Sequence, residues 1–269
     1  MRIKLTITPL NTGSSVLPVN YQYPLSSWIY KVISQGNHAF AKFLHQRGYG
    51  SGNKSFRLFT FSMLDFTRGR YRVFDDRVQF EGSAITMVVS FLIPTALDHF
   101  ISGLFKNQQF TIGDRKSRAS FLVNGVEVLP QPVFSREISF RTLSPVLVSE
   151  QVEGRKNARY MAPDEKHFGK MIINNLVNKL NAVAEADLGI SDPTTEHETT
   201  VDTYGFRLLS TPRKKGVVIK ADTPQQTKII GYLFDFEITA PTALIQVGYH
   251  AGFGEKNSLG FGCCEVLTR

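Results

Sequence analysis

Histidines are the side chains in this sequence best suited to proton transfer near neutral pH, because an unperturbed imidazole titrates at about pH 6.5. His45 follows apolar residues at the predicted end of a short helix, where the helix dipole favours the protonated imidazolium and therefore a proton donor. Lys54 and Arg57 follow it after a glycine-rich turn. His38 is the rival near the start of the same helix, where the dipole disfavours the cation. The sequence holds six histidines: His38, His45, His99, His167, His197 and His250.

A glycine-rich stretch, GYHAGFGEKNSLGFG at 248–262, lies close to the end of the sequence and contains one lysine, Lys256. Backbone without Cβ atoms can approach a phosphodiester chain, with its N–H groups donating and Lys256 neutralising charge. A hairpin packed on a neighbouring domain is the structural alternative, because glycines also serve tight turns. The spacing matches neither a dinucleotide-binding nor a phosphate-loop motif, so we expect no nucleotide cofactor. The predicted contact residues are Gly252, Gly254, Gly260, Gly262 and Lys256.

The net charge of +8 favours a polyanionic partner such as nucleic acid. No run approaches the roughly 18 apolar residues that a membrane span needs, and the opening MRIKLTITPL lacks the apolar region of a signal peptide. We therefore expect a soluble, cytoplasmic protein. The two cysteines, Cys263 and Cys264, are adjacent in a predicted strand and point to opposite faces, so they indicate reduced packing residues and no metal site.

The elements that must position these residues follow one pattern in the first half. Strands are predicted at 1–10, 56–64, 71–76, 77–83, 85–93 and 120–129, from alternation and from their aromatic and β-branched content. Helices are predicted from Leu25 to Gly36, from an Asn37 cap to Gly48, and from Pro94 onward. The order is that of a ferredoxin-like unit, the topology of RNA recognition motifs, with one extra helix.

The second half repeats this pattern more loosely, without visible sequence repetition. Strands are predicted at 137–148, 205–211, 215–220, 232–239 and 261–268, with an amphipathic helix at 164–186. Two prolines in LPQPVFS indicate a boundary. We therefore predict an α+β protein with two tandem ferredoxin-like domains, 1–134 with the candidate catalytic residues and 135–269 with a basic hairpin and the glycine-rich loop.

The stretch GYHAGFGEKNSLGFGCCEVL resembles the carboxy-terminal signature of the CRISPR-associated RAMP superfamily, specifically of the endoribonucleases that process repeat RNA. The opening strand, NYQYPLSSWIYKVI, FLHQRG, FRLFTFSML and TLSPV resemble further segments in that family's order, so the resemblance covers most of the chain. It implies cleavage of the precursor transcript into guide crRNAs without a metal ion or cofactor. In such cleavage the substrate's own 2′-OH attacks the adjacent phosphate and leaves 2′,3′-cyclic phosphate and 5′-OH ends.

The resemblance also implies site residues. It places the family's catalytic histidine at His45 and, as in some members, a tyrosine that joins it at Tyr30. In those relatives a lysine just before the LFT strand completes the set. Here Arg57 holds that position and Lys54 lies three residues earlier. Which of the two cations stabilises the negative charge on the reacting phosphate therefore stays open. We take Lys54 first, because a loop lysine can swing to the site, and Arg57 as a phosphate-binding candidate.

Basic clusters are the predicted grip on RNA, and contacts to backbone phosphates should be sensitive to salt. Family members hold repeat RNA with a basic hairpin in the region of Arg213, Lys214, Lys215 and Lys220. Weaker candidates are Arg155, Lys156 and Arg159, and then Arg68, Arg70 and Arg72. The expected partners are precursor and mature crRNA and a CRISPR effector complex, with the protein a monomer or a homodimer.

Two other functions stay open. The first is a catalytically silent RAMP subunit that only binds repeat RNA, against which the joint presence of His45 and Tyr30 argues. The second is a general RNA-binding protein with tandem recognition-motif-like domains, which would present exposed aromatic residues on its strands.

Overall fold

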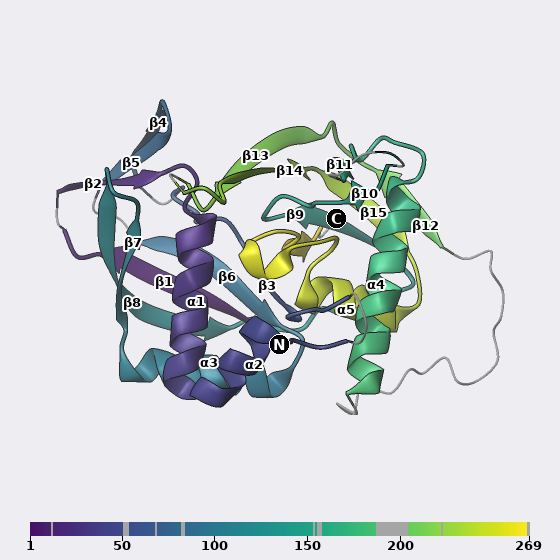
Figure 1. Cartoon of the computed structure of the whole chain (residues 1–269), viewed down its shortest axis with the longest axis horizontal. Coiled ribbons are helices and arrows are strands. Elements are labelled where there is room, and N and C mark those ends of the chain that lie inside the picture. Colours follow the sequence, from purple (N-terminus) through teal and green to yellow (C-terminus); the bar gives the residue numbers. More distant parts are fainter. Residues whose placement is uncertain are drawn as a thin grey trace.

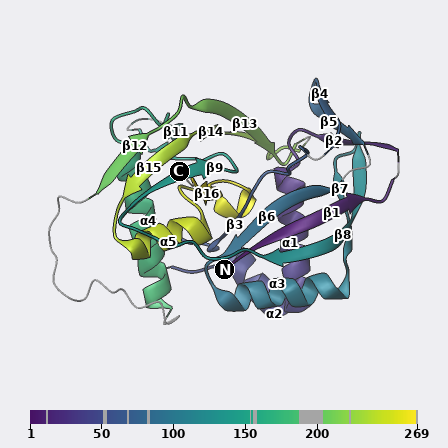
Figure 2. The same cartoon turned by 180° about the vertical axis from the view of Figure 1, so that it is seen from behind.

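The computed structural model of the chain describes residues 1–11, 13–50, 54–67, 69–81, 84–152, 154, 158–186, 204–221 and 223–267. Two antiparallel sheets dominate the fold and lie side by side, the first with helices α1, α2 and α3 and the second with α4 and α5 (Figures 1 and 2). In the described part of the chain, no helix is both long and apolar enough to pass through a bilayer.

The first sheet has the strand order β3-β6-β1-β8-β7. Its chain order, β1-α1-β3-β6-α3-β8, is the predicted ferredoxin-like unit, and β7 adds an edge strand that we did not predict. Phe100 of α3 packs against both Trp28 of α1 and Phe91 of β6, so the two helices cover this sheet together. The bounds are β1 (Arg2–Pro9), α1 (Gln22–Gly36), α2 (His38–Gln46), β3 (Phe59–Phe61), β6 (Ile85–Phe91), α3 (Pro94–Lys106), β7 (Gln109–Gly113) and β8 (Arg118–Val128).

Local sequence explains where the first-half elements begin and end. The side chain of Asn37 caps α2 by accepting a hydrogen bond from the Phe40 N–H at 3.0 Å. The turn after α2 reaches Gly48 in the left-handed region, at φ 67°, which glycine adopts without penalty. Pro94 stands at the start of α3. All three predicted boundaries are confirmed.

Three further strands make a separate sheet in the first half, in the order β2-β5-β4. The strands predicted at 71–76 and 77–83 form β4 (Tyr71–Phe74) and β5 (Arg77–Glu81). Their partner β2 (Ser14–Pro18) lies between the strand predicted at 1–10 and the helix predicted from Leu25, where we predicted neither helix nor strand. The sheet stands at one end of the molecule (Figure 1).

The second sheet has the order β12-β15-β9-β16, and its chain order β9-α4-β12-β15-α5-β16 is again ferredoxin-like. Helix α5 was not predicted, and the single strand predicted at 232–239 is wrong, because it is the end of β14 followed by β15. The bounds are β9 (Glu137–Thr142), β10 (Ser149–Glu150), β11 (Arg159–Tyr160), α4 (Phe168–Glu185), β12 (Gly205–Leu208), β13 (Arg213–Ile219), β14 (Thr227–Leu233), β15 (Asp235–Thr239), α5 (Thr242–Ala251), η2 (Asn257–Leu259) and β16 (Cys264–Val266).

The two halves are joined by buried polar contacts. The guanidinium of Arg2, which is 3% exposed, donates to the carbonyls of Cys264 at 2.7 Å and Tyr249 at 2.5 Å, and lies 3.6 Å from the centroid of the Tyr249 ring. Cys263 and Cys264 are both buried and free, as predicted for packing residues. Residues 129–136, where the boundary at 134/135 is predicted, contain neither helix nor strand. The domain division itself stays a prediction.

Candidate active site

A cleft of about 840 Å³ lies where α1, α2 and the segment before β3 face α4 and the glycine-rich loop. Its lining residues come from both halves of the chain, so the site depends on how the two sheets pack together. All three residues that we predicted for catalysis line this cleft. The predicted residues that line it are Tyr30, His45, Lys54, Arg57, Gly254 and Lys256.

His45 and Tyr30 form the centre of one wall. His45 is exposed in the last turn of α2, and the ring of Tyr30 meets its imidazole edge to face, with centroids 5.7 Å apart. Tyr30 is held from behind by Phe59, at 5.4 Å between centroids. Burial raises the pKa of Tyr30, although hydrogen bonds with Ser258 and Arg57 act in the opposite direction. The phenol therefore keeps its proton near neutral pH and can donate a hydrogen bond.

Arg57 and Lys54 have different surroundings in the cleft. Arg57 donates from its guanidinium to the carbonyl of His45 at 3.0 Å, and also to Ser55. The Ser55 hydroxyl donates in turn to the carbonyl of Arg47. Arg57 thus closes the turn after α2 and holds the backbone of His45. Lys54 is exposed and has no hydrogen-bond or ion-pair partner within the described residues.

Lys179 of α4 fixes the glycine-rich loop to the other wall. Its ammonium donates to the carbonyls of Gly252 at 2.6 Å and Gly254 at 2.9 Å, and to Oδ1 of Asn257 at 2.7 Å. Burial lowers the pKa of Lys179 to about 7, against the effect of the Glu255 charge. We did not predict this residue from the sequence. Its three bonds hold the loop so that Lys256, Ser258 and Leu259 face the cleft.

The glycines of the loop are packed tightly against the protein interior, as the structural alternative in the sequence analysis expects. Gly262 shows the reason: a Cβ there would lie 2.0 Å from the carbonyl oxygen of Phe253. Buried backbone whose N–H groups already have protein acceptors cannot hydrogen-bond an RNA chain. This packing disfavours RNA contact for three of the glycines, and of the four only Gly254 lines the cleft, so the RNA-contact assignment stays a prediction. The N–H groups concerned are those of Gly252 to Gly248, Gly260 to Asn257 and Gly262 to Pro145.

The predicted basic hairpin lies outside the cleft. Arg213, Lys214 and Lys215 of β13 line a separate groove of about 560 Å³, across from Asp65 and Tyr71 of the first half. Burial lowers the pKa of Lys215, and the charge of Arg213 adds to this effect. Lys220 is exposed just after β13. The described cations of the hairpin therefore do not line the cleft of the candidate catalytic residues.

Of the weaker candidates for RNA binding, Arg159 is ion-paired within the protein and three others lie outside the described residues. Arg159 is ion-paired with Glu150 at 2.9 Å and with Glu165 at 2.6 Å, so its charge is already matched and the prediction that it serves as a phosphate ligand is not supported. Arg155, Lys156 and Arg68 lie outside the described residues.

Of the histidines in the described part of the chain, His45 alone lines the cleft. The Nδ1 of His38 lies 3.0 Å from the Ser34 hydroxyl, and His38 does not line the cleft. His250 is buried, which lowers its pKa to about 3. His197 lies outside the described residues. Among the described residues, no cluster of His, Cys, Asp and Glu is arranged to hold a metal ion.

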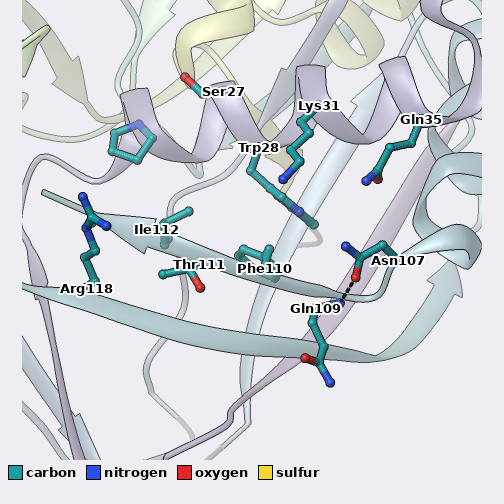
Figure 3. Close-up of a pocket in the computed structure, with 12 residues that line it drawn as sticks. Ser27, Trp28, Lys31, Gln35, Asn107, Gln109, Phe110, Thr111, Ile112 and Arg118 are labelled. Carbon is teal, nitrogen blue, oxygen red and sulfur yellow. Dashed lines mark hydrogen bonds between the residues drawn. The ribbon is translucent and has the colours of Figure 1, made fainter.

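A second hollow, of about 380 Å³, lies between α1 and β7 (Figure 3). At its base Trp28 stacks on Phe110, with centroids 4.0 Å apart. Lys31 and Arg118 supply positive charge at its rim, but no histidine or carboxylate stands among the described residues that line it. Because it lacks a group that could exchange a proton near neutral pH, the larger cleft is the candidate active site.

Two family models match consecutive parts of this chain. The N-terminal model of the CRISPR-associated protein Cas6 matches residues 16–127, and the C-terminal model matches residues 129–266. The CRISPR-associated endoribonuclease Cas6 1 of Methanocaldococcus jannaschii is 27% identical, over 97% of this chain and 91% of its own length. The CRISPR-associated endoribonuclease Cas6 of Pyrococcus furiosus is also 27% identical, over 99% of this chain and 90% of its own.

The solved structures include the product of a Cas6-related gene from Pyrococcus furiosus. It superposes with a TM-score of 0.79 at 23% identity and covers 100% of this chain and 99% of its own. At this identity the likeness shows the fold, which is the tandem ferredoxin-like arrangement described above.

Proposed function

The chain belongs to the Cas6 family of CRISPR-associated proteins, and we propose that it is an endoribonuclease that cleaves the repeat RNA of a CRISPR precursor transcript. Relatives that align along nearly the whole chain are named CRISPR-associated endoribonucleases. The observation that carries the proposal is the cleft, in which Tyr30, His45 and Lys54 meet although they come from three different segments.

The residues of the cleft suit cleavage by the RNA's own 2′-OH. The 2′-oxygen attacks the adjacent phosphorus, the bond to the 5′-oxygen breaks, and the products carry a 2′,3′-cyclic phosphate and a 5′-OH. One proton must leave the 2′-OH and another must reach the departing 5′-oxygen. The first proton passes to solvent in the open cleft, and His45, which is exposed in that cleft, delivers the second. Tyr30 keeps its own proton, so it acts as a hydrogen-bond donor that orients the reacting groups.

The developing negative charge needs a cation on the same side of the cleft. We assign this role to Lys54, because its ammonium has no partner in the described part of the chain, whereas Arg57 is bonded to the His45 carbonyl. Lys256 faces the same space from the glycine-rich loop and can bind a neighbouring phosphate. No step in this scheme requires a metal ion.

The RNA contacts of the proposal extend beyond the cleft. The net charge of +8 and the exposed cations Arg213, Lys214 and Lys220 suit the phosphates of a repeat RNA, in precursor and in mature crRNA. These cations do not line the cleft that holds His45, so an RNA that reaches both must extend beyond that cleft. The cytoplasm, where the transcript is made, is the proposed location.

The test is cleavage of labelled repeat RNA by the purified protein in excess EDTA. A matched RNA with a single 2′-deoxy nucleotide at the cut serves as control. We expect specific cleavage in EDTA that the 2′-deoxy substitution abolishes, and a product whose terminal phosphate is cyclic. Tight binding without cleavage, over several repeat sequences, would instead favour the silent binding subunit.

A further inference from the structure

We propose that three asparagines of α4 form a reading site for one unpaired nucleobase next to the scissile phosphate. We call Asn174, Asn175 and Asn178 the asparagine wall. The inference rests on the proposed function and adds to it the part of the protein that selects a base. Adenine is the base whose edge the wall fits best.

The asparagine wall faces the candidate catalytic residues. All three side chains line the cleft of about 840 Å³, together with Tyr30 and His45. The spacing along α4 places them on neighbouring positions of one helix face. Met171, one turn earlier on the same face, adds an apolar thioether. A cleft of this size can hold a nucleotide whose base is turned away from its neighbours.

The amides of the wall are incompletely used within the described part of the protein. Asn178 donates from Nδ2 to the carbonyl of Asn174 at 2.7 Å, and its Oδ1 accepts no hydrogen bond from the described residues. The Oδ1 of Asn175 is buried without a hydrogen-bond partner. Asparagine is also a poor residue for a helix interior. Three of them line the cleft, and a rotation of the Asn175 amide would turn its buried, unpartnered oxygen toward that space, so the wall suits a ligand with complementary polar groups.

The chemistry of the two walls divides the work between phosphate and base. Lys54, Arg57 and Lys256 supply positive charge and suit phosphate oxygens. The asparagine side chains are uncharged, and the ammonium of their neighbour Lys179 is already bonded to the glycine-rich loop. An amide offers a donor and an acceptor side by side, which can pair with N6 and N7 of adenine. The wall should therefore alter the choice of base and not the attraction to the backbone.

The experiment uses repeat RNAs in which each nucleotide flanking the cut is varied through all four bases. Equilibrium affinity is measured on 2′-deoxy versions that cannot be cleaved, and single-turnover rates on the ribose versions. At one flanking position we expect wild-type protein to prefer adenine over the worst base by about 10-fold, the lower range for one bidentate contact. In the double variant Asn175→Leu, Asn178→Leu, the preference should fall below about 3-fold, and affinity for the worst base should barely change.

Asn181→Leu is the matched control, because Asn181 is exposed on the same helix and does not line the cleft. It should keep the wild-type preference. The single variant Asn178→Ala replaces the double variant if the latter fails to fold, and should reduce the preference in the same direction.

Three outcomes would overturn the reading site: equal affinity for all bases at both positions, a preference for a base other than adenine, or a preference that survives the asparagine variants. Base-dependent binding that the variants abolish, without cleavage of the ribose RNAs, would support the reading site and contradict the proposed endoribonuclease. Absence of binding to every RNA would contradict both.

Discussion

The imidazole of His45 and the phenol of Tyr30 lie edge to face, with their planes at 81°, although the two residues belong to different helices. Phe59 of β3 supports the tyrosine from the other side, also edge to face at 74°. Packing between α1, α2 and β3 thus sets the orientation of the His45 imidazole. The cleft side of His45 remains exposed, so this support leaves the ring accessible to substrate.

His45→Ala should lower the single-turnover cleavage rate by about 10²-fold or more, which is the size of effect expected from losing a general acid. Affinity for the RNA should stay within about twofold, because the imidazole supplies little of the binding charge. His38→Ala is the control, since His38 lies on the same helix outside the cleft. A His45→Ala rate within about threefold of wild type would remove His45 from the mechanism.

Lys54→Ala and Arg57→Ala should separate charge stabilisation from support of the backbone. Lys54→Ala should lower the cleavage rate by about 10²-fold without changing the melting temperature, since the side chain has no partner in the described residues. Arg57→Ala should lower both, because it removes the bond to the His45 carbonyl. Thermal unfolding and single-turnover rates measure the two effects. If only Arg57→Ala lowers the cleavage rate, and its melting temperature is unchanged, then Arg57 and not Lys54 stabilises the charge on the reacting phosphate.

Much of the fold could be predicted because local signals agreed with the global pattern. Asn37 caps a helix as its residue type suggests, and the order of elements in the first half fixed the ferredoxin-like unit. Helix α5 was missed because Pro241 before it and Gly248 within it make this stretch resemble a loop. Gly248 is within this helix for a packing reason: a Cβ there would lie 2.4 Å from the Phe253 ring. Propensity alone cannot reveal such a contact.

The candidate site was predicted only in part. Tyr30 and His45 came from the resemblance, and the structure brings them together. A glycine-rich sequence shows that the backbone approaches another group closely, but it does not show whether that group is a ligand or the protein itself. We therefore assigned the glycines to RNA contact. Lys179 was overlooked, although its position on the same stripe as the buried Leu176 and Val183 was a signal. A lysine on the apolar face of a helix needs acceptors, and here the loop supplies them.

Lys214→Ala should weaken RNA binding and reduce the slope of log affinity against log salt by about one unit, because one phosphate contact is lost. Lys214 is exposed on β13 and lines a groove outside the catalytic cleft, so the cleavage rate at saturating protein should hold. Arg141→Ala is the control, since Arg141 is ion-paired with Asp235 at 2.9 Å. An unchanged slope would make the β13 hairpin an ordinary solvated turn.

Lys179→Met should destabilise the protein by roughly 3 kcal/mol or more, because three buried oxygen acceptors lose their donor. The loop that carries Lys256 and Ser258 should loosen, and cleavage should slow even where the variant is folded. Urea unfolding measures the first effect and single-turnover rates the second. Lys170→Met, at an exposed position of the same helix, should change stability by less than about 0.5 kcal/mol.

The stability that Lys179 provides should also depend on pH. Burial lowers its pKa from 10.5 to about 7 in the folded protein, so between these values the unfolded chain binds more protons than the folded one. Stability then rises with pH in this window, by at most about 1.4 kcal/mol per pH unit, and the contribution is flat below pH 7. The wild-type minus Lys179→Met difference in unfolding free energy isolates this effect, because the other groups are common to both proteins.

We expect that difference to be constant from pH 5 to 6 and to become more favourable to the wild type from about pH 7 to 9. Above pH 7 the neutral amine has two N–H groups for three acceptors, so the loop loses one hydrogen bond even as the cost of burying the charge disappears. A difference that stays constant to pH 9 would show that Gly252, Gly254 and Asn257 stabilise the ammonium enough to cancel the effect of burial. Lys179 would then be a permanent buried cation, held by the loop that it positions.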